Sequence, residues 1–357
     1  MGQEINKRVV VVGGGIVGAS LAYHLARRGA AVTLIEAKDI ASGVTGRSFA
    51  WINTAHRKLD PAAPLRRAAI GEYRRLEMEL PGLKVRWTGA LTSGASALGD
   101  AQYIGDRPAA LPLSHAQVLD LEPNLKHPPA DALYEPEEGA LDAVEATQVL
   151  IAGAQAYGAR ILTRTPVVGF TSDAGHVTGV TTSAGVIEAD VVVLAAGTGI
   201  TELAQTLHTP LPIEASPALF IRYKTQPDRV RTIVSFPEME IRQGVDGSLL
   251  AAEDYVDDTP GNQPLEIALR TARTIQDTLH GVASIEPEVA CVGLRPVPAD
   301  GVPIIGYLPR SQRVYVCVMH PGVTLAAGVG RLASEEILEG KVVASLNAFR
   351  PDRFLRP

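Results

Sequence analysis

Apolar residues near the start of the chain form two short runs separated by a helical pattern. Residues 9–12 are four consecutive valines, as expected of a parallel strand that is buried on both faces. Small apolar residues then recur at helical spacing between Ala19 and Ala26, and Gly29 is placed to end the helix. A second apolar run covers residues 31–35. This order of strand, helix and strand predicts a βαβ unit.

Later segments predict two further pieces of the same kind. Residues 159–189 alternate between apolar and polar positions and are broken at 173–175 and 183–185, which predicts a small antiparallel meander. A buried strand is expected at 191–195 and another at 313–319. The second of these precedes a glycine turn at Gly322 and a helix that ends before Gly340.

The intervening segments have a different character. The stretches "PALFIRYKT" and "GSLLAAEDY", between residues 211 and 284, read as strands. "SHAQVLDLEPNL" predicts a short helix capped by Ser114 and ended before Pro123. A charge-rich helical segment carries Arg66, Arg67, Arg74 and Arg75, which we interpret as a solvated helix face.

Length and composition narrow the class of protein. A chain of 357 residues exceeds the usual size of a single core, so two domains are expected. With 46% hydrophobic and 20% charged residues it resembles an ordinary globular protein. A net charge of −6 gives no electrostatic case for a nucleic-acid partner. No apolar run approaches the length of a membrane span.

The two cysteines and the start of the chain bear on its location. Two cysteines in so long a chain predict no disulfide framework and fit a reducing compartment. The start, "MGQEINKRVVVVGGG", lacks the layout of a signal peptide. We therefore expect a cytoplasmic protein, and no metal site.

The βαβ unit carries a dinucleotide fingerprint. Gly13, Gly15 and Gly18 give G-x-G-x-x-G, in which the glycines permit the tight turn, the approach of a pyrophosphate and close packing of helix on strand. Glu36 ends the second strand, where a carboxylate can accept hydrogen bonds from a ribose diol and would repel the extra phosphate of NADP. A meander followed by a strand ending in Ala-Ala-Gly favours FAD, because further βαβ units would follow in an NAD dehydrogenase.

Four motifs together make the chain resemble the D-amino-acid oxidase (DAO) family, which includes glycine oxidase, sarcosine oxidase and D-amino-acid dehydrogenases such as D-arginine dehydrogenase. They are the fingerprint, "ASGVTGRSFAWIN", "VVVLAAGTG", and "GLRPVPADGVPIIG" followed by "HPGVTLAAGVG". The resemblance covers nearly the whole chain and implies an α/β fold. It implies a Rossmann-like FAD-binding domain of the glutathione-reductase type from residues 1–80, 141–210 and 285–357. A mainly antiparallel β-sheet substrate domain would comprise 81–140 and 211–284.

The fingerprint and the resemblance together give the positions expected to contact FAD: Gly13, Gly15, Ile16, Val17, Gly18, Glu36, Ala37, Gly46, Arg47, Ser48, Val167, Ala196, Gly197, Gly322, Val323, Thr324 and Leu325. In the sarcosine oxidase branch a cysteine that attaches FAD would align with Gly293, and Cys291 lies two residues away. The resemblance therefore implies non-covalent FAD, and we interpret Cys291 as a core thiol.

Arg295 is a charged residue in an otherwise apolar stretch. In the DAO family an arginine in the context G-[FL]-R-P fixes the substrate carboxylate, and "GLRP" matches it here. The planar guanidinium suits this role because it bonds a carboxylate through two N–H groups. The alternatives are a pair with Asp300 or a side chain that reaches outward. A second arginine of some relatives has no aligned equivalent, because Arg222 lies two residues past that point.

Other candidate substrate residues come from the loop after Glu36. His56 falls where the D-arginine dehydrogenase branch has a pocket tyrosine, with a surface or capping role as the alternative. Trp51 is a candidate pocket wall, with core packing as the alternative. Many relatives carry Gly-His-Gly before the last helix, whereas this chain reads His320-Pro321-Gly322, so roles are not transferred to His320.

The sequence thus predicts an FAD-dependent oxidoreductase that passes hydride from Cα of an amino acid to flavin N5. The imine would hydrolyse to a 2-oxo acid and ammonia. Alternatives are an enzyme for N-methyl or cyclic secondary amines, or an FAD-binding subunit of a heteromeric amine dehydrogenase. The electron acceptor, oxygen or a carrier, stays open, although the lack of a lysine near Leu250 leans towards a dehydrogenase. The oligomeric state stays open too.

Overall fold

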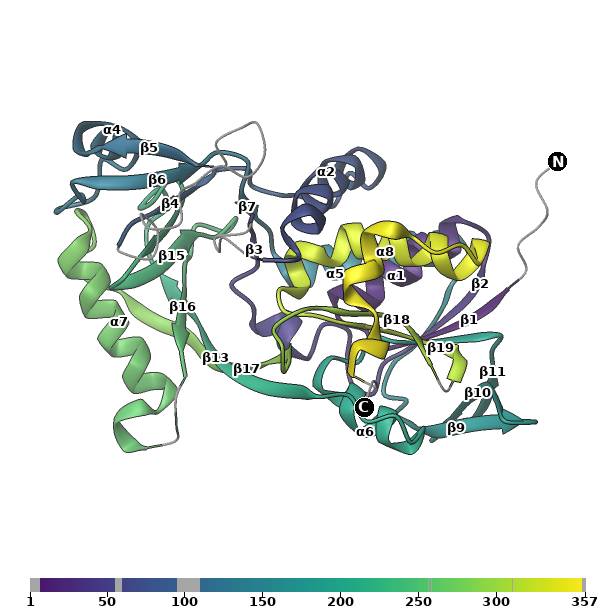
Figure 1. Ribbon diagram of the computed structural model, residues 1–357. Coiled ribbons are helices and arrows are strands. Elements are labelled where there is room, and N and C mark those ends of the chain that lie inside the picture. Colours follow the sequence, from purple (N-terminus) through teal and green to yellow (C-terminus); the bar gives the residue numbers. More distant parts are fainter. Residues whose placement is uncertain are drawn as a thin grey trace.

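The computed structural model describes residues 7–54, 60–94, 110–255, 257, 259–309 and 311–354. It has a mixed α/β fold with two large sheets, one mostly parallel and one mostly antiparallel. Figure 1 shows them as two halves of the molecule, joined by the long ribbon of β13 (Ile213–Lys224) and β17 (Glu286–Pro298).

The mostly parallel sheet has six strands in the order β18-β19-β12-β1-β2-β8. Their bounds are β18 Ile304–Leu308, β19 Ser311–Val318, β12 Val191–Leu194, β1 Arg8–Val12, β2 Ala31–Ile35 and β8 Arg160–Leu162. Only β18 runs antiparallel to its neighbour. The predicted βαβ unit is confirmed, because α1 (Ile16–Arg27) connects the parallel pair β1 and β2.

Helices cover one face of this sheet and a small sheet covers the other. The helical face carries α1, α2 (Ala63–Glu79), α5 (Ala143–Ala156) and α8 (Gly322–Glu339), packed around one apolar cluster. The other face carries α6 (Ile200–Thr206) and the meander β9 (Val167–Asp173), β10 (His176–Thr182) and β11 (Gly185–Glu188). The meander and both of its breaks are as the sequence predicted.

The second sheet has eight strands in the order β17-β13-β16-β15-β14-β4-β6-β5. The remaining bounds are β16 Leu249–Asp254, β15 Met239–Gln243, β14 Ile233–Phe236, β4 Ala90–Thr92, β6 Asp131–Glu135 and β5 Leu111–Ser114. All pairings are antiparallel except that of β14 with β4. The strands predicted from "PALFIRYKT" and "GSLLAAEDY" are β13 and β16.

The two faces of the eight-stranded sheet are covered differently. On the outer face, α7 (Pro264–Thr278) packs against residues such as Leu219, Ile221 and Ala251, and Figure 1 shows this helix along the outside of the sheet. On the inner face, Leu250 and Ile233 pack with Phe49 and Ala140 from the other half of the molecule. The inner face therefore looks toward the six-stranded sheet and its helices.

Short elements complete the chain. The strands β3 (Trp51–Ile52) and β7 (Gly139–Ala140) pair with each other. The helix α4 (His115–Leu121) begins with a capping box formed by Ser114 and Gln117, as the sequence predicted. The 3₁₀ turns are η1 Val44–Arg47, η2 Gly197–Gly199, η3 Pro260–Asn262, η4 Ala344–Phe349 and η5 Pro351–Phe354. No helix in the described ranges is both long enough and apolar enough to cross a membrane.

The domain boundaries stay a prediction, as does the cytoplasmic location. β17 was assigned with the third FAD segment, but its strand pairing is with β13 in the eight-stranded sheet. The interpretation of a solvated helix face on α2 holds for Arg67 and Arg74, which are exposed. It is wrong for Arg66, whose side chain is only 14% exposed and turns inward. This side chain bonds Asp60 and Asn53, which lie before the helix.

Candidate functional site

The turn between β1 and α1 requires glycine for steric reasons. Gly13 has a φ of +113°, and a Cβ there would lie 2.5 Å from the carbonyl oxygen of Ala195. A Cβ on Gly18 would lie 1.9 Å from the carbonyl oxygen of Gly13. Both positions therefore exclude any side chain, as close packing of turn, helix and neighbouring strand demands.

Glu36 is held beside this turn. Its carboxylate accepts hydrogen bonds from the backbone N–H of Gly14 at 2.7 Å and of Lys38 at 2.8 Å. In the described part of the chain the N–H groups of Gly15, Val17 and Gly18 have no acceptor. Free donors at a helix N-terminus are suited to a phosphate, and a fixed carboxylate at the strand tip is suited to a ribose diol.

The loop containing η1 lies directly against the turn. Thr45 Oγ1 accepts a hydrogen bond from the Ile16 N–H at 3.2 Å. A Cβ on Gly46 would meet the Ala41 carbonyl oxygen at 2.6 Å, and the Ser48 hydroxyl accepts from the Ala50 N–H. Thr45 was not among the predicted residues, although it stands inside the quoted motif "ASGVTGR".

The remaining predicted positions of the first two FAD segments surround the same turn. A Cβ on Gly13 would lie 2.8 Å from Cα of Ala196, and Gly197 follows in η2 with a φ of +57°. Ala37 is exposed directly after Glu36. Val167 begins β9, two residues after Thr165, whose N–H bonds the carbonyl of Glu36.

The start of α8 meets the start of α1. A Cβ on Gly322 would lie 3.6 Å from Val17, and Leu325 N–H bonds the carbonyl of Pro321. Tyr73 donates to the Val323 carbonyl at 2.5 Å. The Thr324 hydroxyl lies 3.1 Å from both the Trp51 carbonyl and the Asn53 side-chain oxygen. The third predicted segment thus lies beside the first two, and the donors and the carboxylate fit a dinucleotide such as FAD.

Arg295 lies on the inner face of the eight-stranded sheet, directly opposite Ser216 of β13. Its Nη2 donates to Ser216 Oγ at 3.0 Å and to the Pro217 carbonyl at 3.3 Å. Its Nε is buried without a partner, and no carboxylate of the described residues lies within 4.0 Å. The alternative pair with Asp300 is wrong, because Asp300 pairs with Arg353.

Arg295 acts electrostatically on His320, which precedes α8 in the other half of the molecule. Burial, followed by the positive charges of Arg295 and Arg66, lowers the pKa of His320 to about 4. His320 has exposed surface. It is neutral at pH 7 and lies within electrostatic reach of the Arg295 guanidinium.

Trp51 stands between the two halves. It packs edge-to-face on Phe49 and donates from Nε1 to the buried carboxylate of Glu138 at 2.8 Å. Glu138 also accepts from the backbone N–H and the hydroxyl of Thr54, both at 2.6 Å. Burial raises the pKa of Glu138 to about 7. His56 lies outside the described residues, so its role stays a prediction.

One further sequence interpretation changes. Cys291 is only half-buried and lies near Arg47, whose charge opposes the rise in the pKa of the thiol caused by burial. The core-thiol interpretation is therefore wrong for Cys291 but describes Cys317. Arg222, on the inner face, pairs with Asp246 at 2.7 Å. Arg66 and Glu138 were missed, because no motif marks them and only tertiary contacts bring them here.

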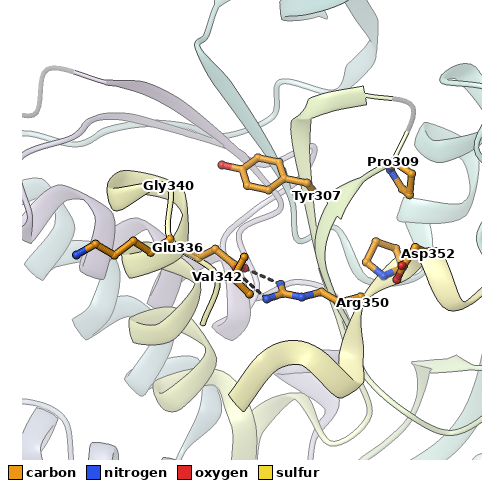
Figure 2. A pocket seen from close by; sticks show the side chains of 9 residues that line it. Tyr307, Pro309, Glu336, Gly340, Val342, Arg350 and Asp352 are labelled. Carbon is orange, nitrogen blue, oxygen red and sulfur yellow. Dashed lines mark hydrogen bonds and ion pairs between the residues drawn. The ribbon is translucent and has the colours of Figure 1, made fainter. Parts of the chain in front are cut away.

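A separate hollow of about 390 Å³ lies at the other end of α8. Since α8 has 18 residues, this end is about 27 Å from Gly322. Figure 2 shows Glu336 and Arg350 turned toward each other in its wall, with two hydrogen bonds of 2.7 and 2.6 Å. Tyr315 also donates to Glu336 at 2.5 Å. These charges satisfy each other and offer nothing to a ligand.

Comparison with known proteins gives one family. The sequence pattern of DAO, described as FAD dependent oxidoreductase, matches residues 8–336. A glycine oxidase of Bacillus licheniformis is 26% identical over 96% of both chains. A D-amino acid dehydrogenase 2 of Pseudomonas aeruginosa is 29% identical over 93% of this chain and 95% of its own length.

Solved structures show the same fold. An L-proline dehydrogenase from P. horikoshii superimposes with a TM-score of 0.85 at 22% identity, over 98% of both chains. A glycine oxidase from Bacillus cereus gives a TM-score of 0.83 at 21% identity, over 97% of this chain and 98% of the other. The expected α/β architecture with parallel and antiparallel sheets is confirmed.

Proposed function

Because the chain belongs to the DAO family of FAD-dependent oxidoreductases, we propose that it oxidises the C–N bond of an amino acid, with Arg295 binding the α-carboxylate. The family relationship makes it an FAD-dependent amine or amino acid oxidoreductase. Its relatives differ in substrate, so the choice of an amino acid depends on the residues of this chain.

The observation that carries the proposal is the unpaired guanidinium of Arg295. It is oriented by Ser216 and Pro217 but faces no carboxylate among the described residues. A partly buried cation without an anionic partner is poorly stabilised, whereas a ligand carboxylate would supply two charge-assisted hydrogen bonds. His320, neutral at pH 7, does not compete with Arg295 for that carboxylate.

The FAD-binding residues follow from the convergence of three segments. The N–H groups at the start of α1 would bind the pyrophosphate, and Glu36 a ribose diol. FAD, when bound, supplies the two-electron acceptor that takes hydride from Cα at flavin N5. Attachment is proposed to be non-covalent, since Gly293, packed with Val44 and Arg47, has no side chain to bond the flavin.

The chain's own contribution is orientation and charge. Arg295 would fix the carboxylate so that the Cα–H bond has one direction, which lowers the entropic part of the barrier. The N-terminus of α8, where Gly322 and Val323 lie, would place its partial positive charge near the reacting end. The oxidised product, an imine, hydrolyses in water to a 2-oxo acid and ammonia.

The first experiment is an anaerobic flavin-reduction screen of the purified protein with D-, L- and N-methyl amino acids. Bleaching of the flavin absorbance by an amino acid is expected. Replacing Arg295 by Ala should lower kcat/KM by roughly tenfold or more, since a charged hydrogen bond contributes about 1.5–3 kcal/mol. Arg295→Lys should recover part of the loss, because the lysine ammonium keeps the positive charge but cannot bond the carboxylate through two N–H groups as the planar guanidinium does.

The matched control is Arg222→Ala. Arg222 is an arginine on the same sheet face, but it is paired with Asp246, so kcat/KM should stay within a factor of two or so of the wild type. Unchanged turnover in Arg295→Ala would disprove the carboxylate assignment.

The same screen tests the alternatives. Bleaching by sarcosine- or proline-like amines alone would favour an enzyme for secondary amines. A yellow protein that no amine bleaches would favour a subunit that needs a partner. A peroxide assay after reduction distinguishes oxygen from another electron acceptor.

A further inference from the structure

The inner face of the eight-stranded sheet carries, besides Arg295, a glutamate that has no cationic partner among the described residues. Residues directly opposite each other on neighbouring strands share a face, and alternate residues of a strand do so too. Glu240 of β15 lies opposite Ala252 of β16, which lies opposite Phe220 of β13. Phe220 is four residues from Ser216, the neighbour of Arg295, so Glu240 and Arg295 share the inner face.

This face is covered unevenly. The row that contains Leu250, Arg242 and Ile233 is buried, and Arg242 donates to the carbonyls of Phe49 and Leu141. The next row, with Phe220, Ala252 and Glu240, is only half-buried. The rows that hold Glu240 and Arg295 are thus the part of the inner face that the protein itself leaves partly open.

Glu240 has no cationic partner among the described residues. Within that part of the chain its only hydrogen bond comes from the hydroxyl of Ser235 at 3.3 Å, and no Lys, Arg or His nitrogen lies within 4.0 Å. Burial, and to a smaller extent Asp254 and Glu253, raise the pKa of Glu240 to about 7, while Ser235 and Arg295 act to lower it. A half-buried carboxylate with this environment gains from any cation that approaches it.

The two charges are too far apart for the α-carboxylate and the α-amine of one amino acid. The Arg295 guanidinium is held over β13 by Ser216 and Pro217. Glu240 belongs to β15, two strand spacings or about 10 Å across from β13, and its row lies four residues, about 13 Å, along the strands from the row of Ser216. Groups on a single carbon atom do not span that distance, whereas an extended side chain with a terminal cation does. The floor between them includes the small side chains of Ala218 and Ala252 and, opposite Ala218, the exposed Asp254, whose carboxylate also faces a side-chain cation bound here.

We propose that the site takes amino acids whose side chain ends in a cation, with Arg295 on the α-carboxylate and Glu240 on the side-chain cation. This inference rests on the proposed amino acid oxidation and adds its substrate class. Glu240 is then a specificity residue, since the bond that breaks lies at the other end of the substrate.

The test compares lysine with norleucine, which has the same chain without the terminal ammonium. Anaerobic flavin reduction is measured with both, in both enantiomers, for the wild type and Glu240→Gln. The wild type should prefer lysine by tenfold or more, and Glu240→Gln should lose roughly that factor while norleucine is unaffected. The preference for lysine should also grow as the pH rises from 6 to 8, because Glu240 ionises in that range.

The matched control is Glu253→Gln. Glu253 is close enough to act on Glu240, but it lies on the outer face and accepts a hydrogen bond from Thr271 of α7. The substitution Glu253→Gln removes one negative charge, as Glu240→Gln does, but leaves the inner face unchanged. The preference for lysine should therefore persist. A nonspecific charge effect would instead lower the preference in both variants.

The outcomes separate the two proposals. If neutral or acidic amino acids bleach the flavin better than lysine and arginine do, the substrate class is wrong and amino acid oxidation stands. If no amino acid bleaches it, both fail. Should Glu240→Gln not fold, the wild-type ratio of lysine to norleucine still decides, because a ratio near one overturns the inference.

Discussion

The two ends of α8 hold charges in opposite states. At the far end, Glu336 is bonded by both Nη atoms of Arg350 and by the hydroxyl of Tyr315. Burial acts to raise the pKa of Glu336, but these hydrogen bonds outweigh it and lower the pKa. At the near end, Arg295 and Glu240 have no partner of opposite charge among the described residues.

The difference separates charges that hold the fold together from charges that are available to a ligand. A carboxylate closed within its own ion pair stabilises the native state, and its removal leaves a buried cation. A cation and an anion kept apart on a half-covered sheet face add little to stability and can bind groups of opposite charge. Three changes test this contrast, and the kinetic tests of Arg295 and Glu240 complete it.

The largest effect on stability is expected for Glu336→Gln. The change leaves Arg350 without its carboxylate and should lower the free energy of unfolding by about 3 kcal/mol, measured by urea denaturation. The loss should shrink as the pH falls below about 4, since the lowered pKa stabilises the fold only while Glu336 is ionised. Flavin reduction by the folded variant should be unchanged.

The control is Glu335→Gln, one residue away on the same helix, where the carboxylate forms a part-exposed pair with Arg331. Its loss should stay below about 1 kcal/mol. Equal losses of unfolding free energy in the two variants would mean that the buried group of Glu336, Arg350 and Tyr315 stabilises the fold no more than an ordinary surface ion pair does.

An intermediate effect on stability, with the opposite pH dependence, is expected for Glu138→Gln near the start of α8. Because burial raises the pKa of Glu138 to about 7, its ionisation above pH 5 favours the unfolded chain. Between pH 5 and pH 8 the wild type should lose on the order of 2 kcal/mol of stability relative to the variant. Denaturation at the two pH values measures this change.

The exposed neighbour Glu137 provides the comparison. Glu137→Gln should change the free energy of unfolding by less than about 0.5 kcal/mol, as expected of an exposed side chain. A difference between wild type and Glu138→Gln that stays constant from pH 5 to pH 8 would mean that Glu138 does not titrate in that range in the folded protein.

The smallest effect on stability is expected for Arg295→Ala. Its guanidinium has only the bonds to Ser216 and Pro217 to lose, so the free energy of unfolding should change by less than about 1 kcal/mol. Thermal unfolding of the flavin-free protein measures it. A loss as large as that of Glu336→Gln would make Arg295 a structural residue and break the contrast.

Much of the FAD-binding part could be predicted because its signals are local. The strand 8–12, the glycines at 13 and 18, and Glu36 follow one another within thirty residues, and each has a steric or electrostatic reason that holds in any context. The ends of α1 and α8, at Gly29 and Gly340, were predictable for the same reason, since both glycines adopt positive φ.

The inner sheet face could not be predicted in this way. Arg66 was interpreted as one more charge on a solvated helix, and no sequence motif marks Glu240. Arg66 turns inward because Asp60 and Asn53 lie beside it. Glu240 shares a sheet face with Arg295 only because β15, β16, β13 and β17 pair in that order.

The sequence by itself determined the nucleotide-binding turn, the succession of strands and helices and the presence of one arginine in an apolar segment, since backbone sterics and side-chain periodicity act between near neighbours. The tertiary structure alone decided which charged side chains form ion pairs and which have no partner of opposite charge among the described residues. That outcome depends on strand order and register, which bring together residues such as Ser216 and Arg295, 79 positions apart, and on which part of a sheet face the rest of the chain covers.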